Sequence, residues 1–94
     1  MQITHLGHSA VLVETPDARV LIDPGNFSDA WHGVTDLDAI LVTHQHADHV
    51  DPAHVPALAV LNPQARILVE PAVMQVVPLD RAQALAPDGS VTIG

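Results

Sequence analysis

The stretch AILVTHQHADH, residues 39–49, carries the main signals for the fold and the function of this chain. Its first four residues are apolar and are bounded by polar sequence, which predicts a short strand buried on both faces. The next seven residues place three imidazoles and one carboxylate directly after that strand. Open sheets hold their sites at strand ends. The stretch therefore predicts a functional site at one edge of a sheet.

The spacing of these side chains favours a metal site. His44 and His46 alternate, so in an extended segment they point the same way and can converge on one ion. Asp48 and His49 lie just beyond and can supply a second ion. Imidazole is the commonest metal ligand, carboxylate is its usual oxygen partner at zinc, and two neighbouring metals are a route to hydrolysis. The alternative is a loop of solvated histidines; a buried strand that leads into His-x-His-x-Asp-His makes this the weaker interpretation.

The residues before this stretch predict an antiparallel meander. Residues 2–6, 9–14 and 19–22 are three short apolar runs separated by turn chemistry, including Thr-Pro-Asp at 15–17. Asp-Pro-Gly-Asn at 23–26 breaks the pattern, and a loop is expected to about residue 35.

The residues after the stretch predict alternating helices and strands. Asp51 is a candidate helix cap with Pro52 at the first position, for a helix that runs to Leu61. A buried strand is expected at 66–69, helices at 71–77 and 78–86, and the start of a further strand at 91–93. The whole pattern predicts an α/β (α+β) fold with a mixed sheet.

Length and composition narrow the class of protein. Ninety-four residues make one domain at most, and the absence of cysteine excludes thiolate metal sites. Eleven acidic residues face three arginines and no lysine, which argues against binding to nucleic acid or to an anionic membrane. No signal peptide and no apolar run of membrane-spanning length is present, so a soluble, cytoplasmic protein with a small-molecule substrate is expected.

A family resemblance adds to these inferences. His-Gln-His-Ala-Asp-His at 44–49 resembles the signature of the metallo-β-lactamase fold superfamily. Gly-His-Ser at 7–9, Leu-Ile-Asp-Pro at 21–24 and Asp-His-Val-Asp at 48–51 resemble a branch similar to ascorbate-6-phosphate lactonase. The resemblance implies that residues 1–94 form a single half domain, the N-terminal half of the αββα sandwich, with helices on one face of a mixed sheet.

The resemblance also implies a metal centre and a reaction. His44 and His46 match ligands of a first zinc site, and Asp48 and His49 match ligands of a second. One or two zinc ions, or iron or manganese, would activate water to attack a lactone, ester or phosphoester. Asp48 is in addition the candidate catalytic carboxylate, which would hold or accept the proton of that water.

Other residues are open to two interpretations. Asp23 matches an acidic residue that supports the ligands from behind, but it also suits a turn before Pro24. His8 either borders the site or is a plain loop histidine. Trp31 either lines a pocket or covers the core. The remaining histidines are expected to be structural or solvated: His5, His32 and His54.

The family's full ligand set is not found in these residues. The family takes a further histidine, a bridging aspartate and a final histidine from later segments, and no residue after Asp51 stands in a matching context. The chain therefore fits a fragment of a longer enzyme best, ahead of a natural half domain or a degenerate remnant, and little activity is expected of these 94 residues alone. A half sandwich would expose one apolar sheet face, which predicts a homodimer. The alternative function is a self-associating metal-binding module without turnover.

Overall fold

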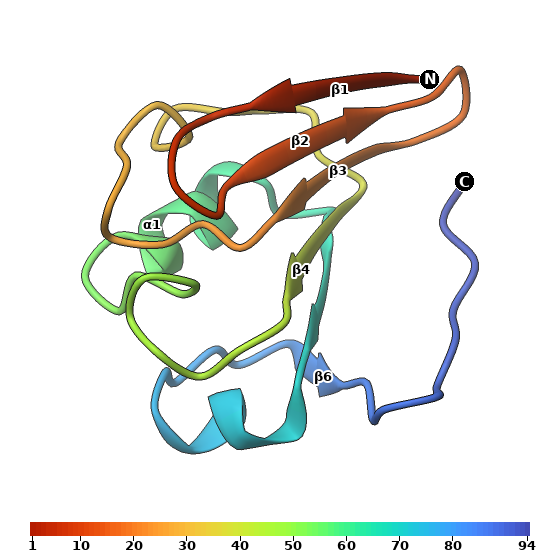
Figure 1. The fold of residues 1–94 in the computed structure, drawn as a ribbon. Helices are drawn as coiled ribbons and strands as arrows, with labels where there is room; N and C mark the ends of the chain where they lie inside the picture. Colours follow the sequence, from red (N-terminus) through yellow and green to blue (C-terminus); the bar gives the residue numbers. More distant parts are fainter.

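All 94 residues are described by the computed structural model, whose centre is a six-stranded mixed sheet in the order β1-β2-β3-β4-β5-β6 (Figure 1). Strands β1 to β3 form the expected antiparallel meander, and β4, β5 and β6 add to β3 in parallel. The strand bounds are β1 Gln2–His5, β2 Val11–Glu14, β3 Arg19–Ile22, β4 Ala39–Val42, β5 Arg66–Val69 and β6 Ala82–Ala84.

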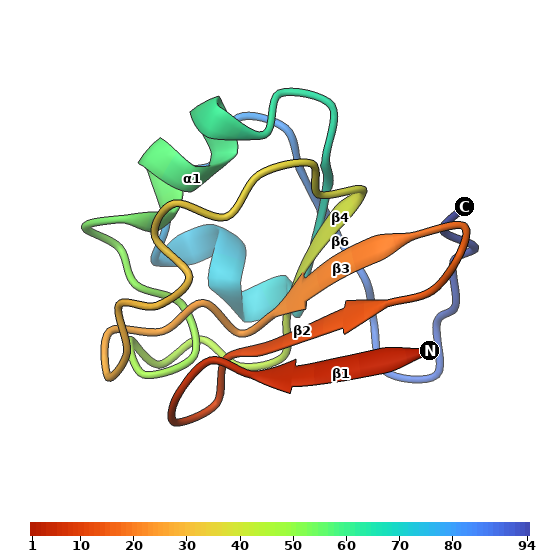
Figure 2. The same cartoon turned by 90° about the horizontal axis from the view of Figure 1, so that it is seen from above.

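The helices lie on one face of this sheet, as expected for the fold. Helix α1 spans Val55–Leu61, and the 3-10 helix η1 spans Pro71–Gln75, within the helix expected at 71–77. Figure 2 shows both on the same side, opposite the C-terminal segment. They cover an apolar core whose buried members include Leu12, Leu21, Ile40, Ile67 and Val73.

Trp31 belongs to this core. Its side chain is fully buried, and its indole Nε1 donates a hydrogen bond of 3.0 Å to the Gly25 carbonyl oxygen. A buried indole usually finds such a partner. The structure therefore decides between the two interpretations of this residue: Trp31 covers the core and lines no pocket.

Helix α1 begins later than the sequence predicts. A turn occupies residues 52–54, and the helix starts at Val55 rather than at Pro52. Asp51 organises this turn, because its Oδ1 accepts from the Ala53 N–H at 2.9 Å and its carbonyl accepts from the Val55 N–H at 2.9 Å. Pro56 then falls in the first turn of α1, where the N–H that proline lacks would have no helical partner.

The helix expected at 78–86 is wrong, because β6 forms there. Ala82 pairs with Ile67 and Ala84 with Val69, in parallel with β5. The open edge of β5 offers backbone hydrogen bonds that outweigh the helix preference of alanine. Arg81 fixes the approach to this strand by donating to the carbonyl oxygens of Ala59, Ala65 and Asn62.

The strand expected to begin at 91–93 is also wrong. Residues 90–94 have no regular element and run as an extended tail past the sheet (Figure 1). One side-chain hydrogen bond reaches this tail, from Arg66 Nη1 to the Thr92 carbonyl oxygen at 3.2 Å, and Val91 and Ile93 are half-buried.

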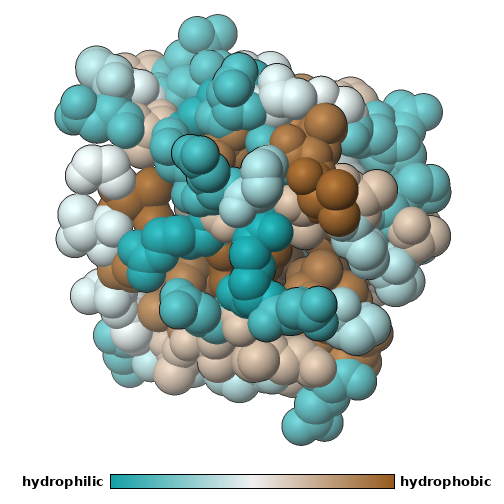
Figure 3. Space-filling view, turned by 180° about the vertical axis from the view of Figure 1, so that it is seen from behind, coloured by the Kyte–Doolittle hydropathy of each residue, from teal (hydrophilic) through white to brown (hydrophobic).

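The face opposite the helices is less covered. Alternate residues of β2 and β3 on that face are only partly buried, whereas Leu12 and Leu21, which point to the helices, are buried. Figure 3 views the molecule from behind Figure 1, the side on which α1 lies, and shows hydrophobic side chains between polar ones there as well. The partly buried residues on the face opposite the helices are Val11, Val13, Val20 and Ile22.

None of the helices has the length and apolar character needed to cross a membrane, and the cytoplasmic location stays a prediction.

Candidate metal centre

The histidine motif lies in the loop between β4 and α1, at the carboxyl end of β4. The loop is not extended throughout, because the N–H groups of His49 and Val50 both donate to the His46 carbonyl oxygen, at 2.9 and 3.1 Å. This turn brings the imidazoles together. His44 stacks on His46 with ring centroids 4.1 Å apart, and on His49 with centroids 5.2 Å apart.

Asp48 and His49 have the spacing of two ligands on one ion. His49 Nε2 and Asp48 Oδ2 lie 3.6 Å apart. Ligand atoms about 2.0–2.2 Å from a tetrahedral zinc are separated by about 3.4 Å. Three imidazoles and a carboxylate are also a donor set that zinc accepts. The residues present therefore fit a zinc ion in their chemistry.

The four motif side chains do not all converge. Their ligand atoms are not all within 4.8 Å of one another, whereas those of His32, Asp51 and His54 are. The loop thus gathers three rings and one carboxylate without closing them around a single point. An ion shared by the whole motif would require the exposed side chains of His44 and His46 to turn inward.

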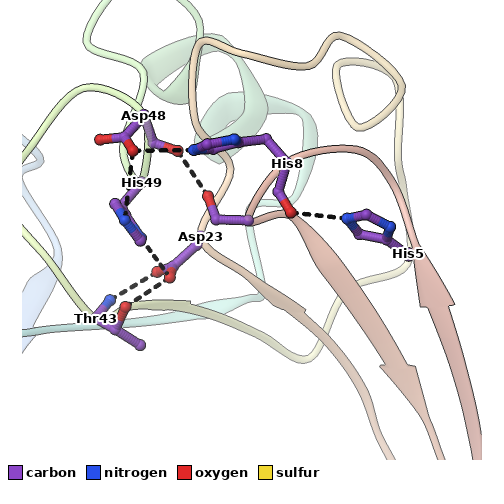
Figure 4. Close-up of polar contacts among 7 residues, drawn as sticks. His5, His8, Asp23, Thr43, Asp48 and His49 are labelled. Atoms are coloured by element: carbon purple, nitrogen blue, oxygen red, sulfur yellow. Dashed lines mark hydrogen bonds and ion pairs between the residues drawn. The ribbon is translucent and has the colours of Figure 1, made fainter.

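Asp23 lies against the motif at the end of β3, and its buried carboxylate accepts three hydrogen bonds (Figure 4). Oδ1 accepts from the Thr43 N–H at 2.7 Å; Oδ2 accepts from Thr43 Oγ1 at 2.5 Å and from His49 Nδ1 at 2.9 Å. Because a carboxylate only accepts, His49 carries its proton on Nδ1 and keeps a free lone pair on Nε2. This arrangement orients an imidazole for metal binding. It also gives Thr43 a contact in the site.

His8 reaches the motif from the loop between β1 and β2. Its Nε2 donates to Asp48 Oδ2 at 3.0 Å, so of the two interpretations of His8 the structure supports the one in which it borders the site (Figure 4). That hydrogen bond holds the pKa of the Asp48 carboxyl below its ordinary value. The carboxylate therefore stays charged, as a metal ligand must.

Two further residues shape the site, and the sequence analysis did not single them out. Ser9 Oγ donates to the Asp48 carbonyl oxygen at 2.6 Å. A Cβ placed on Gly25 would lie 1.8 Å from that same oxygen, so the loop after β3 touches the motif backbone directly. The available signal was position, since Ser9 follows His8 and Gly25 follows the Asp-Pro pair at 23–24.

The three histidines expected to be structural or solvated fall into two groups. His5 Nε2 donates to the His8 carbonyl oxygen at 2.7 Å, which is a structural role. His32 and His54 instead stack on each other beside Asp51, with ring centroids 4.3 Å apart. No sequence pattern predicts that His32 and His54 lie together, because His32 belongs to a different loop.

Comparison with known proteins agrees with this fold and motif. The family model of the beta-lactamase superfamily domain matches residues 2–93. The chain belongs to the beta-lactamase superfamily. The predicted membership and the predicted mixed-sheet fold are thereby confirmed.

Two bacterial relatives of this beta-lactamase superfamily chain and one solved structure of similar fold illustrate the match. Protein Rv0786c of Mycobacterium tuberculosis is 49% identical over 71 residues, which cover 76% of this chain and 34% of the relative. The UPF0173 metal-dependent hydrolase mll0680 of Mesorhizobium japonicum is 42% identical over 59 residues, 56% of this chain and 25% of the relative. A crystal structure named "Putative metal-dependent hydrolase from Parabacteroides distasonis" superposes with a TM-score of 0.66 at 23% identity, over 86% of this chain and 36% of that one.

The lengths of these relatives bear on function. The chain spans roughly a quarter to a third of the curated relatives that it matches, 25% and 34% of their lengths. The fold and the family are shared over that span. The activity and partners of a whole protein are therefore matters for proposal.

Proposed function

We propose that this beta-lactamase superfamily protein is a metal-dependent hydrolase that uses zinc to cleave a lactone, ester or phosphoester. The observation that carries the proposal is the contact between buried Asp23 and His49, which leaves His49 Nε2 free and 3.6 Å from the Asp48 carboxylate. His44 and His46 stand beside this pair. Zinc suits these ligands best, although iron and manganese accept the same set.

Each motif residue has a proposed task. His44 and His46 hold one ion, and Asp48 and His49 hold a second. Such an ion, when bound, lowers the pKa of a coordinated water toward neutrality. Asp48 is a weak base because its pKa is lowered, so it holds a water by accepting a hydrogen bond more readily than it removes a proton. His8, through its contact with Asp48, keeps that carboxylate turned toward the site.

Hydrolysis assays test the catalytic part of this proposal. We expect a protein that carries these residues together with the remaining length of the relatives to turn over generic lactone or phosphodiester substrates. This turnover should disappear with a chelator and return with added zinc, and we expect His44→Ala to remove it. Gln45→Ala, an exposed neighbour in the same loop, serves as the control and should keep the activity. Metal binding without any turnover would overturn the catalytic proposal for these residues and support the non-catalytic metal-binding module.

The alternative module depends on self-association through the sheet face opposite the helices. We propose that a second copy of the chain covers this face as a two-fold dimer, because the partly exposed valines there form an apolar surface without a helix. The part of the longer relatives that this chain does not match is the competing candidate to cover this face. Light scattering coupled to gel filtration distinguishes them for the 94-residue chain.

The dimer makes a specific mutational prediction. Val13→Arg places a charge on the proposed interface and should convert the dimer to a monomer. Val60→Arg is the matched control, since Val60 is 79% exposed on helix α1, away from that face, and should leave the dimer intact. A wild-type chain that elutes as a stable monomer at tens of micromolar would refute self-association.

A further inference from the structure

We propose that His32, Asp51 and His54 form a second site for a divalent transition metal, separate from the histidine motif. One ligand atom from each of these three residues lies within 4.8 Å of the other two. Asp51 and His54 come from the segment that leads into α1, and His32 comes from the loop between β3 and β4. The site would therefore tie two loops together.

The two imidazoles are held side by side. The rings of His32 and His54 stack at 4.3 Å with an interplanar angle of 19°, and the indole of Trp31 packs edge-on against His32 at 4.5 Å. Because Trp31 is fully buried, its packing against His32 restricts the movement of the His32 ring. The two rings are thus placed before any ion arrives, which reduces the cost of ordering them.

The carboxylate is fixed more firmly than the rings. Asp51 is 5% exposed, its Oδ1 accepts from the Ala53 N–H, and its Oδ2 accepts from His54 Nδ1 at 2.7 Å. An ion bound by Oδ2 and Nδ1 replaces the proton that now joins them, and that proton leaves to solvent. Its ligands then need to move only slightly to reach the spacing of about 3.4 Å that tetrahedral zinc requires.

The surroundings favour a cation of borderline softness. The three residues line one solvent-accessible pocket that has no Lys or Arg in its lining, and Asp29 adds a further carboxylate to that lining. Calcium and magnesium prefer sites made of oxygen alone, whereas two imidazoles with a carboxylate suit zinc and its neighbours. A water can complete the coordination, since His54 is exposed.

The position of the site suggests its purpose. The Asp51 N–H donates to the Pro24 carbonyl oxygen at 2.9 Å, so this cluster joins the segment that carries Asp23 to the segment that carries the histidine motif. An ion that binds only the folded chain stabilises it. Metal at this site would fix the relative positions of the two loops that form the motif site, without taking part in the chemistry of that site.

Zinc titration in a variant without the motif ligands tests this inference independently of the proposed hydrolase. In the His44→Ala/His46→Ala/Asp48→Asn/His49→Ala background we expect calorimetry to find about one zinc per chain. Adding His32→Gln and His54→Gln should weaken this binding at least tenfold and remove the zinc-induced rise in melting temperature. His5→Gln in the same background is the control, because His5 contacts only the His8 carbonyl oxygen, and it should change neither readout.

The outcomes separate the two proposed sites. A background variant that binds no zinc, or one whose zinc binding survives the loss of His32 and His54, overturns the second site. Circular dichroism of each variant verifies that the chain remains folded, as expected for side chains that are exposed or half-buried. Loss of the second site would leave the motif site intact, and a motif variant with unchanged total zinc content would refute the motif site alone.

Discussion

The His44→Ala/His46→Ala variant is expected to lose zinc binding at the motif loop, with affinity reduced by more than about 100-fold. Residues that merely orient a ligand contribute about 10–100-fold to metal affinity, and removing two ligands must cost more. Asp48 and His49, the proposed ligands of the second ion, would remain near each other, but two protein ligands are fewer than the three or four that zinc sites use, so we expect the second ion to be lost with the first. Competition with a chromogenic chelator measures the change.

The control for this variant comes from the same loop. Gln45 lies between the two histidines and is exposed, so Gln45→Ala alters the loop surface without removing a donor of the motif. It should bind zinc as the unaltered chain does. If the double histidine variant retained the full zinc content and affinity, His44 and His46 would be solvated loop residues and the metal site would have to be sought elsewhere.

Gly25→Ala is expected to destabilise the fold by about 1–3 kcal/mol or more, the range found for overpacking in tight sites. The added Cβ would lie 1.8 Å from the Asp48 carbonyl oxygen and 2.8 Å from the His49 nitrogen. Both neighbours are backbone atoms, so no side-chain rotation relieves the contact, and the motif loop has to move away from the loop after β3. Urea denaturation measures the loss.

Gly33→Ala is the matched control for this steric effect. A Cβ on Gly33 would meet no atom within 4 Å. Since alanine restricts the unfolded chain more than glycine does, this variant should be neutral or more stable by a few tenths of a kcal/mol to about 1 kcal/mol. Equal stabilities for the two alanine variants would show that the loop after β3 does not constrain the motif.

The sequence predicted those parts of the fold that depend on local patterns. The meander, β4 and β5 follow from short apolar runs with turn residues between them, and β4 and β5 were recovered with the bounds the structure gives. β6 was missed because Ala82 and Ala84 favour a helix locally, and only the neighbouring edge of β5 makes them a strand. The start of α1 was misplaced because Asp51 uses its side chain for a turn instead of a helix cap.

The residues of the site also divide into those whose grouping follows from local sequence and those that meet only through tertiary packing. The motif side chains are close in sequence, so their grouping could be read directly. The contacts of Asp23 and His8 were only suggested by a resemblance, since each crosses a large sequence separation, 26 residues to His49 and 40 residues to Asp48. His32 meets His54 through the packing of two loops, which no local pattern encodes.

The triple contact of Asp23 has a consequence for the order of folding. Asp23 follows β3 and Thr43 follows β4, so the carboxylate reaches its partners only after these two strands have paired in parallel. Parallel pairing between distant segments is a slow, late event in a folding chain. His49 therefore acquires its binding orientation near the end of folding. We expect an ion bound there to lower the rate of unfolding more than it changes the rate of folding.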